Sequence, residues 1–473
     1  MPAGVTKNGG GLGEFIISSG VVLTSFSNSF LPTVGFSSER GVDPKHPLEA
    51  KVFPNDFYVG KTRPGFGSQR PYPVRTRITG PARLDYHGVG VKVEEAVADG
   101  RRTVVWESDE PVNFFNVVGA DWSVWRGDGT AIYHHARHGY NLEEMGIALD
   151  ASRKYYSEWF YPFPWQELRL NEFPGLASYA QGFPSNITFS ESIGFLTRSS
   201  REANTAFMVT AHEAAHQWWG NLVLPGEGPG GNILSEGMAH FSTILLFDQV
   251  HGSRGRIEFC KRIEERYGDA RQVDSERPLV RVDGSRPGDT TVTYDKGGWV
   301  FWMLHDLMGE DASLAGIREF VRTYHVNDDH PVLQDYIATL RPHAPDPETF
   351  DAFVEQWFYE VVVPELAFAD LEKKQEHGRW VVTATAQNKG SGRVPIEIAV
   401  TRGERFPKED AGSDSSRADR SGDAYREERV MLVLGPEEIQ SVRLECDFEP
   451  THLLADPDAR VLQLRREAAR KGL

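Results

Sequence analysis

One short segment, HisGluAlaAlaHis at 212–216, combines residue types that can hold a metal ion and activate water. The surrounding residues 204–219 include no glycine or proline, so this stretch should be helical. Two histidines four residues apart on a helix project from one face, so both imidazoles can reach one ion. Glu213 can then accept a proton from metal-bound water. The pattern predicts zinc-assisted hydrolysis, because zinc acts as a Lewis acid and lowers the pKa of water.

A catalytic zinc normally has three protein ligands and one open position, so a third ligand is expected on a nearby element. LeuSerGluGlyMetAlaHis (234–240) offers Glu236 at the start of the next helix, just after a glycine-rich loop. Glu227 lies inside that loop and is the weaker candidate. Two structural alternatives remain open at this point. The histidines can be core residues of an amphipathic helix, and Glu236 can be an exposed residue stabilised by the helix dipole.

A further candidate, Tyr294, lies in ValThrTyrAspLysGlyGly (292–298), just before another helix. A phenol at this place can donate a hydrogen bond to the oxyanion of a tetrahedral intermediate. The alternative is a buried aromatic residue with a satisfied hydroxyl, and spacing alone favours that alternative.

The elements that must position these residues fall into three regions of a multidomain α+β chain. We expect an antiparallel β domain over 1–145, because short runs of β-forming residues alternate with Gly, Asp and Pro. A mainly helical domain is expected over 146–366, with a small extended block at 166–196. Strands return in a β-sandwich over 370–473, interrupted by a polar surface insertion at 402–429. The helical spacing of apolar residues covers 145–160, 202–219, 235–250, 255–267, 297–308, 314–324 and 347–359.

Composition excludes several classes of protein. The formal charge of −17 over 473 residues disfavours nucleic-acid binding, which needs clustered Lys and Arg. Two cysteines, Cys260 and Cys446, cannot form a disulfide scaffold and are expected to be buried thiols. The first residues lack the pattern of a signal peptide, and no stretch is an uninterrupted membrane span. We therefore expect a soluble chain. His134, His135 and His138 share no carboxylate or cysteine within metal-binding spacing and are expected to be surface or strand-end histidines.

Together, HisGluAlaAlaHisGlnTrpTrpGlyAsn (212–221), LeuSerGluGlyMetAlaHis (234–240) and TyrAspLysGly (294–297) resemble the M1 family of zinc metallopeptidases, the gluzincin aminopeptidases. PheValGluGlnTrpPhe (353–358) resembles the family's late helical segment. The resemblance covers most of residues 110–366. It implies a thermolysin-like catalytic domain, with an N-terminal β domain before it and an immunoglobulin-like β-sandwich after it. It also implies one zinc ion per chain and a peptide substrate.

The resemblance further assigns roles to individual residues. His212, His216 and Glu236 are implied as the zinc ligands, Glu213 as the general base and Tyr294 as the transition-state stabiliser. The family usually places eighteen residues between the second histidine and the ligand glutamate, whereas this sequence has nineteen. The glycine-rich loop at 221–232 must absorb the extra residue.

A second departure from the family concerns the substrate. Family aminopeptidases carry a GxMEN strand whose glutamate pairs with the free amine of the substrate. In the corresponding region, 179–191, Gly182 and Phe183 match the first part, but Pro184 occupies the position of the glutamate. Glu191 is the candidate replacement, and its alternative is an ordinary structural carboxylate. We assign Gln181, Gly182 and Glu191 to substrate binding on this basis.

This altered strand resembles a divergent M1-like branch in which the peptidase domain is fused to membrane permease segments of an ABC transporter. Residues 30–36 resemble the lead-in of that branch. Aminopeptidase activity is the family default, and the missing glutamate makes an endopeptidase the alternative. A non-catalytic zinc-containing module of a membrane transporter is a third function, but a structural site has no need of Glu213. We expect a cytoplasmic compartment by default. For a chain fused to, or associated with, a permease, we expect an extracytoplasmic one.

Overall fold

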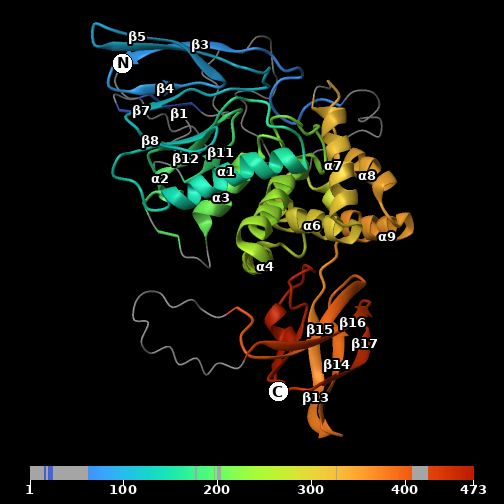
Figure 1. The fold of residues 1–473 in the computed structure, drawn as a ribbon. Coiled ribbons are helices and arrows are strands. Elements are labelled where there is room, and N and C mark those ends of the chain that lie inside the picture. The colour runs from blue at the N-terminus through green and yellow to red at the C-terminus, as the bar shows by residue number, and fades with distance from the viewer. Residues whose placement is uncertain are drawn as a thin grey trace, which may run out of the picture.

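The computed structural model describes residues 15–17, 20–24, 62–175, 178–196, 198–199, 204–325, 328–406 and 424–473. The predicted lead-in at 30–36 and most of the predicted polar insertion, residues 407–423, lie outside these ranges. The described chain is a multidomain α+β structure with several sheets, and its helices lie between the N-terminal strands and the C-terminal strands (Figure 1). No helix in the described ranges is long and apolar enough to cross a membrane.

The N-terminal strands form two antiparallel sheets, as the alternation of β-forming residues predicts. One sheet has the order β1-β2-β7-β4 and the other the order β3-β6-β5. Small clusters of buried residues hold them, for example Leu84, Tyr86, Val104 and Trp106. The strands are β1 (Phe15–Ile17), β2 (Val22–Thr24), β3 (Arg75–Pro81), β4 (Asp85–His87), β5 (Val91–Ala98), β6 (Arg101–Glu107) and β7 (Val118–Ala120).

A five-stranded mixed sheet, of order β11-β12-β10-β9-β8, supports the helices. Its three central strands, β9, β10 and β12, are parallel, and the strands at its two edges are antiparallel to their neighbours. The sequence places residues 123–134 in an antiparallel β domain, yet they form two strands of this mixed sheet. The reason is that α1 (Leu142–Trp159) carries the chain from β9 to β10, and a crossover of this kind makes two strands parallel. The strands are β8 (Ser123–Arg126), β9 (Thr130–His134), β10 (Leu168–Phe173), β11 (Ala180–Gln181) and β12 (Asn186–Ser190).

The helices occur where the apolar spacing predicts them. The two predicted helices at 235–250 and 255–267 are halves of α4 (Glu236–Ala270), which is interrupted at Gly252 by a backbone φ of 67°. The sequence prediction missed three helices, which are the short α2 and α5 and the eight-residue α8. The other helices are α2 (Glu191–Gly194), α3 (Thr205–Ala215), α5 (Asp289–Thr291), α6 (Gly297–Met308), α7 (Glu310–Tyr324), α8 (Leu333–Leu340) and α9 (Pro347–Phe358).

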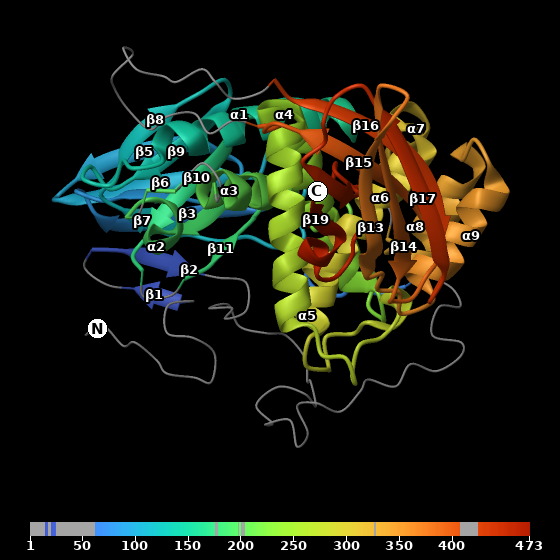
Figure 2. The same ribbon diagram turned by 90° about the horizontal axis from the view of Figure 1, so that it is seen from below.

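The C-terminal strands form two further antiparallel sheets, of order β13-β14-β17 and β16-β15-β18-β19. Strands therefore return in this region, as the sequence predicts. The elements are β13 (Leu366–Glu376), β14 (Arg379–Asn388), β15 (Val394–Arg402), β16 (Arg426–Leu434), β17 (Ile439–Cys446), β18 (His452–Ala455) and β19 (Arg470–Gly472). Seen from below, they lie in front of the helices, and the segment after β18 contacts α4 through a hydrogen bond from the Gln463 amide to Glu264 at 3.0 Å (Figure 2).

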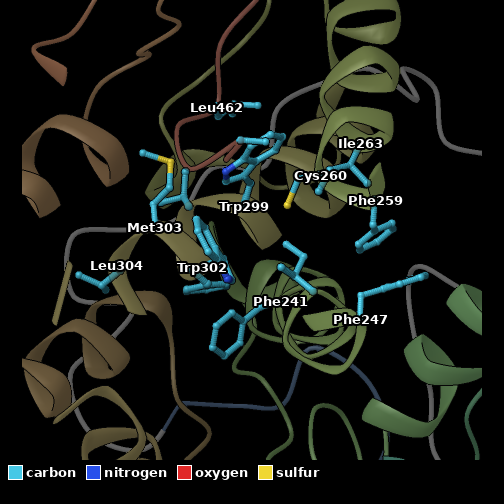
Figure 3. Close-up of a cluster of buried hydrophobic side chains, with 14 of the residues drawn as sticks. Phe241, Phe247, Phe259, Cys260, Ile263, Trp299, Trp302, Met303, Leu304 and Leu462 are labelled. Carbon is cyan, nitrogen blue, oxygen red and sulfur yellow. The ribbon is translucent and has the colours of Figure 1, made fainter. Parts of the chain in front are cut away.

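One large core joins the helices to the C-terminal region. Leu462, which follows β18, packs near Trp299 of α6 and Cys260 of α4 (Figure 3). Cys260 and Cys446 are both free and buried, as predicted. A buried ion pair reinforces this contact, because Arg466 donates from Nε and Nη2 to the two oxygens of Glu264, each at 2.8 Å. The Arg466 and Glu264 side chains are only 11% and 7% exposed.

We expect the substitution Arg466→Met to lower the free energy of unfolding by about 3–5 kcal/mol, because it leaves the Glu264 carboxylate buried without its cation. Urea denaturation followed by tryptophan fluorescence measures this change. The matched control is Arg341→Met, because Arg341 and Asp351 form an ion pair whose side chains are 52% and 49% exposed. The control should leave the free energy of unfolding almost unchanged, because solvent screens an exposed ion pair. Equal costs for the two variants would contradict the prediction.

Candidate functional site

The three segments predicted to carry catalytic or metal-binding residues, 212–216, 234–240 and 292–298, meet at one cavity of about 740 Å³. Helix α3, the first turn of α4, strand β11 and the π-helical turn η3 (Val292–Lys296) contribute to its walls. Phe66 and Phe114 from the N-terminal region complete it, and Phe114 contacts Phe183 with ring centroids 5.8 Å apart. The cavity is therefore assembled from segments far apart in the sequence.

Three ligand atoms face one point at the base of this cavity. His212 Nε2, His216 Nε2 and Glu236 Oε2 form a triangle in which each atom lies 3.2 Å from the other two. Ligands bound to one zinc ion at about 2.0 Å with tetrahedral angles lie about 3.3 Å apart. The spacing therefore fits a zinc ion with an open fourth position.

The hydrogen bond of the second imidazole supports this fit. His216 Nδ1 donates to the carbonyl oxygen of Trp219 at 2.8 Å, which leaves the Nε2 lone pair directed into the triangle. Burial lowers the pKa of His216, but the negative charge of Glu236 outweighs it and raises that pKa to about 9. Burial also raises the pKa of Glu236, and the charge of His216 outweighs it and holds that pKa well below its usual range. The site is thus built to attract a cation.

Glu213 lies beside the ligand triangle. Its carboxylate is within 4.8 Å of the ligand nitrogens of His212 and His216. Burial raises the pKa of Glu213 to about 7, while the charge of His216 and a backbone hydrogen bond from Gly182 act in the opposite direction. A carboxylate with a pKa near neutrality is suited to accept a proton and return it.

Tyr294 also lines the cavity and lies beside His212. Its ring stacks near His212, with centroids 5.7 Å apart and an interplanar angle of 22°. Burial and the charge of Glu236 raise its pKa, so the phenol stays protonated and can act as a donor. The turn that carries it is π-helical, a local widening that often occurs at functional sites.

The residues after His216 explain why helix α3 is held so closely against strand β11. Gln217 donates to the carbonyl oxygen of Phe183 at 2.9 Å and accepts from the Ser185 amide at 2.7 Å. Asn221 donates to the carbonyl oxygens of Gly182 and His216. These bonds fix the ends of the helix and the strand relative to each other.

Strand β11 approaches α3 so closely that only glycine fits at position 182. A Cβ there would lie 2.6 Å from the Glu213 carbonyl oxygen and 2.8 Å from Cβ of His216. Gln181 and Gly182, the predicted substrate-binding residues, both line the cavity. Glu191 does not line it. Its carboxylate lies near His138 and Glu172 instead, because it follows β12 at the end of the strand away from Gly182.

The extra residue between His216 and Glu236 is accommodated in a loop that contains several glycines with positive φ. Gly220, Gly228 and Gly230 have φ values of 115°, 144° and 76°, which other residues rarely adopt. A short 3₁₀ turn, Gly231–Leu234, then leads into α4. Glu236 therefore reaches the triangle, whereas Glu227 does not line the cavity.

Three residues behind the triangle were missed by the sequence prediction. His240 Nδ1 lies 2.9 Å from His212 Nδ1, and Arg266 Nη2 lies 2.9 Å from His240 Nε2. Arg266 also donates from Nε to both oxygens of Asp295, each at 2.9 Å. One signal was available, since His240 follows Glu236 by four residues and so shares its helix face. No sequence signal pointed to Arg266 or Asp295, because their contacts join segments that are far apart in the sequence.

Comparison with known proteins agrees with this geometry. Residues 140–357 match the family model "Peptidase family M1 domain". Human endoplasmic reticulum aminopeptidase 1 is 28% identical over 220 residues, which are 42% of this chain and 22% of that protein. Aminopeptidase N of Haemonchus contortus is 26% identical over 201 residues, which are 40% of this chain and 21% of that protein. The match thus spans about a fifth of the length of these relatives.

The fold has a counterpart among solved structures. Aminopeptidase A of Legionella pneumophila, solved in complex with aspartic acid, has a TM-score of 0.57 to this chain at 16% sequence identity. The superposition covers 85% of this chain and 45% of that one. The motif residues, their convergence at one cavity and the match to the family model agree. Residues 140–357 of this chain are therefore similar to a peptidase family M1 domain.

Proposed function

We propose that this chain is a zinc metallopeptidase that hydrolyses peptide bonds, with one catalytic zinc ion held by His212, His216 and Glu236. The observation that carries the proposal is the triangle of ligand atoms, 3.2 Å on each side, with Glu213 beside it. When bound, zinc supplies Lewis acidity that polarises a carbonyl group and lowers the pKa of water.

The chain's own residues supply the proton transfers and the remaining stabilisation of charge. Glu213 takes a proton from the attacking water as the water oxygen bonds to the carbonyl carbon. It then gives that proton to the departing amine as the C–N bond breaks, so its carboxylate is regenerated. Tyr294 donates a hydrogen bond to the negative charge that develops on the carbonyl oxygen. Gln181 and Gly182, at the wall of the cavity, contact the substrate backbone.

Activity like that of an aminopeptidase is the first candidate, because the relatives are aminopeptidases. One observation favours a second candidate, an endopeptidase. Among the described residues, only Glu213, Glu236 and Asp295 are carboxylates that line the cavity. Glu236 contacts the two histidines, and Asp295 pairs with Arg266. Glu213 is the proposed proton acceptor. A protonated substrate amine therefore finds no uncommitted carboxylate on these walls.

A paired peptide screen tests the function and separates the two candidates. Each peptide is offered to the zinc-loaded protein with a free N-terminus and, separately, with an acetylated one. We expect cleavage of both forms at similar rates, because no uncommitted carboxylate among the described cavity residues can pair with a free amine. Cleavage restricted to free N-termini would restore the aminopeptidase assignment. Cleavage of neither form, by protein shown to contain zinc, would contradict the proposed function. Cleavage products are identified by mass spectrometry.

The finer organisation of the chain is also a proposal. We assign residues 1–145 to an N-terminal β domain, 146–366 to a thermolysin-like peptidase domain and 370–473 to an immunoglobulin-like β-sandwich. The two antiparallel C-terminal sheets and the helical centre support this division. Fusion to, or association with, a transporter permease rests on the resemblance of residues 179–195 to that branch. The compartment follows from it: extracytoplasmic if such a permease exists, and otherwise cytoplasmic.

A further inference from the structure

A second group of metal-ligating side chains lies outside the cavity, at the carboxyl ends of the three parallel strands. His138 follows β9, Glu172 is the penultimate residue of β10, and Glu191 directly follows β12. The three strands are neighbours in the sheet, so segments separated by up to fifty residues end at one edge. The carboxyl edge of parallel strands is where α/β sheets commonly bind ligands. None of the three residues lines the cavity of the zinc triangle.

The three side chains face one another. His138 Nδ1 hydrogen-bonds to Glu172 Oε1 and lies 3.7 Å from Glu191 Oε2. The three ligand atoms all lie within 4.8 Å of one another. The Glu172 side chain is 4% exposed, whereas those of His138 and Glu191 are 21% and 24% exposed. One side of the group is thus open to solvent, and the Glu172 carboxylate is buried.

Backbone groups hold both carboxylates in position. The His135 amide donates to Glu172 Oε2 at 2.6 Å, and the Gly175 amide donates to Glu191 Oε1 at 2.7 Å. Each carboxylate therefore uses one oxygen for a backbone bond and presents the other to His138. Bonds of this kind orient the ligands of metal sites before the metal arrives.

The loop that carries His138 is fixed as well. His134 Nδ1 lies 2.9 Å from the carbonyl oxygen of His138 and 3.1 Å from that of His135. The amide of His138 also donates to the His135 carbonyl oxygen at 2.8 Å. The imidazole of His135 stands close by, with its ring centroid 4.6 Å from that of His138.

The charges at this edge are not balanced. No lysine or arginine among the described residues forms an ion pair with Glu172 or Glu191, and their facing oxygens repel each other. Burial raises the pKa of Glu172, and the charge of Glu191 acts in the same direction. A protonated His138 supplies one positive charge for two carboxylates, whereas a divalent cation supplies two.

We propose that His138, Glu172 and Glu191 bind a second divalent cation of the borderline transition-metal type, such as Zn²⁺. One imidazole with two carboxylates suits such ions, because Mg²⁺ and Ca²⁺ prefer ligand sets made of oxygen alone. This second ion goes beyond the one zinc ion per chain that the family resemblance implies. The sequence analysis did not predict a site here, because both carboxylates come from segments distant from the histidines.

The position of the site suggests what the ion does. Glu191 binds the amide of Gly175, and the amide of Ser190 donates to the carbonyl oxygen of Tyr179 at 3.0 Å. Tyr179 and the next two residues line the catalytic cavity. A cation on Glu191 would therefore anchor the end of β12 against which strand β11 is paired, and the role of the ion is structural.

Counting zinc ions tests the proposal. A chelator first removes metal from the full chain, which is then reloaded with ZnCl₂ and passed through gel filtration. Inductively coupled plasma mass spectrometry then measures the zinc bound per chain. We expect two zinc ions in the parent and one in Glu191→Gln. Glutamine keeps an acceptor oxygen for the Gly175 amide, so the fold should be preserved. His138→Gln, which removes the imidazole, should also bind one, and circular dichroism confirms that each variant is folded.

Two further variants separate the sites. The matched control is Glu143→Gln, an exposed carboxylate in the first turn of α1, which should keep both ions. His216→Gln should lose the catalytic ion and keep the second. One ion in the parent, with no loss in Glu191→Gln, would overturn the proposal in favour of a simple His138–Glu172 ion pair. Two ions in all of the His138 and Glu191 variants would also overturn it, because the second ion would then lie elsewhere. Neither outcome bears on the catalytic triangle, which His216→Gln reports.

Discussion

Replacing Glu213 with glutamine should lower the rate of peptide hydrolysis by a factor of about 10²–10⁴ and leave zinc binding unchanged. Glutamine has nearly the same shape, so the cavity is preserved, but its amide cannot take a proton from water. Glu213 is suited to this task because burial brings its pKa to about 7. The rate is measured on a peptide that the parent cleaves, at saturating and at low substrate, and zinc is measured on the same sample.

The matched control for this prediction is Glu227→Gln. Glu227 belongs to the loop between the two zinc-binding segments, carries the same charge and does not line the cavity. The same chemical change at Glu227 should leave the rate within a factor of about two, since it removes no group near the substrate. Unchanged hydrolysis in Glu213→Gln would refute the role of Glu213 as base. Loss of zinc from that variant would show instead that its carboxylate is a ligand.

The residues predicted for the centre of the site lie together because their geometry is mostly local. His212 and Glu213 lie on α3, and His216 caps its C-terminal end, so helical periodicity alone brings the two imidazoles together. The prediction for Glu236 required one further assumption, that the loop at 221–232 brings the start of α4 back to the two histidines. Tyr294 was placed by resemblance to a family and not by spacing. The side chains that hold these residues, Arg266 and Asp295, belong to segments that meet only after folding.

The fold was likewise predicted where it depends on local sequence and not where it depends on contacts between distant segments. Strands and helices lie where periodicity predicts them, but periodicity does not say which strands pair. Residues 123–134 read as part of the N-terminal strands, and they pair with β10 because α1 packs across the sheet. The position of Glu191 depended on the same long-range information. Its distance along β12 from Gly182 carries it to the opposite end of the strand, away from the cavity.

Removing zinc should abolish hydrolysis, and adding back zinc should restore it. The ligand atoms of His212, His216 and Glu236 converge at 3.2 Å, and no other group in the described part of the cavity can take over the polarisation of the carbonyl. Glu236→Gln should therefore need a higher zinc concentration for half-maximal activity, by a factor of about 10² or more, because it replaces an ionic ligand by a neutral one.

Zinc titration of chelator-treated protein, followed by the rate of peptide cleavage, measures both effects. Glu227→Gln is again the control and should regain activity at the same zinc concentration as the parent. If Glu236→Gln is reactivated at the parent's zinc concentration, the third ligand lies elsewhere, and Glu227 becomes the first residue to test. If chelation leaves the parent fully active and elemental analysis finds the protein free of metal, hydrolysis does not depend on the triangle. The catalytic role of all three ligands would then have to be abandoned, since their convergence would have no chemical consequence.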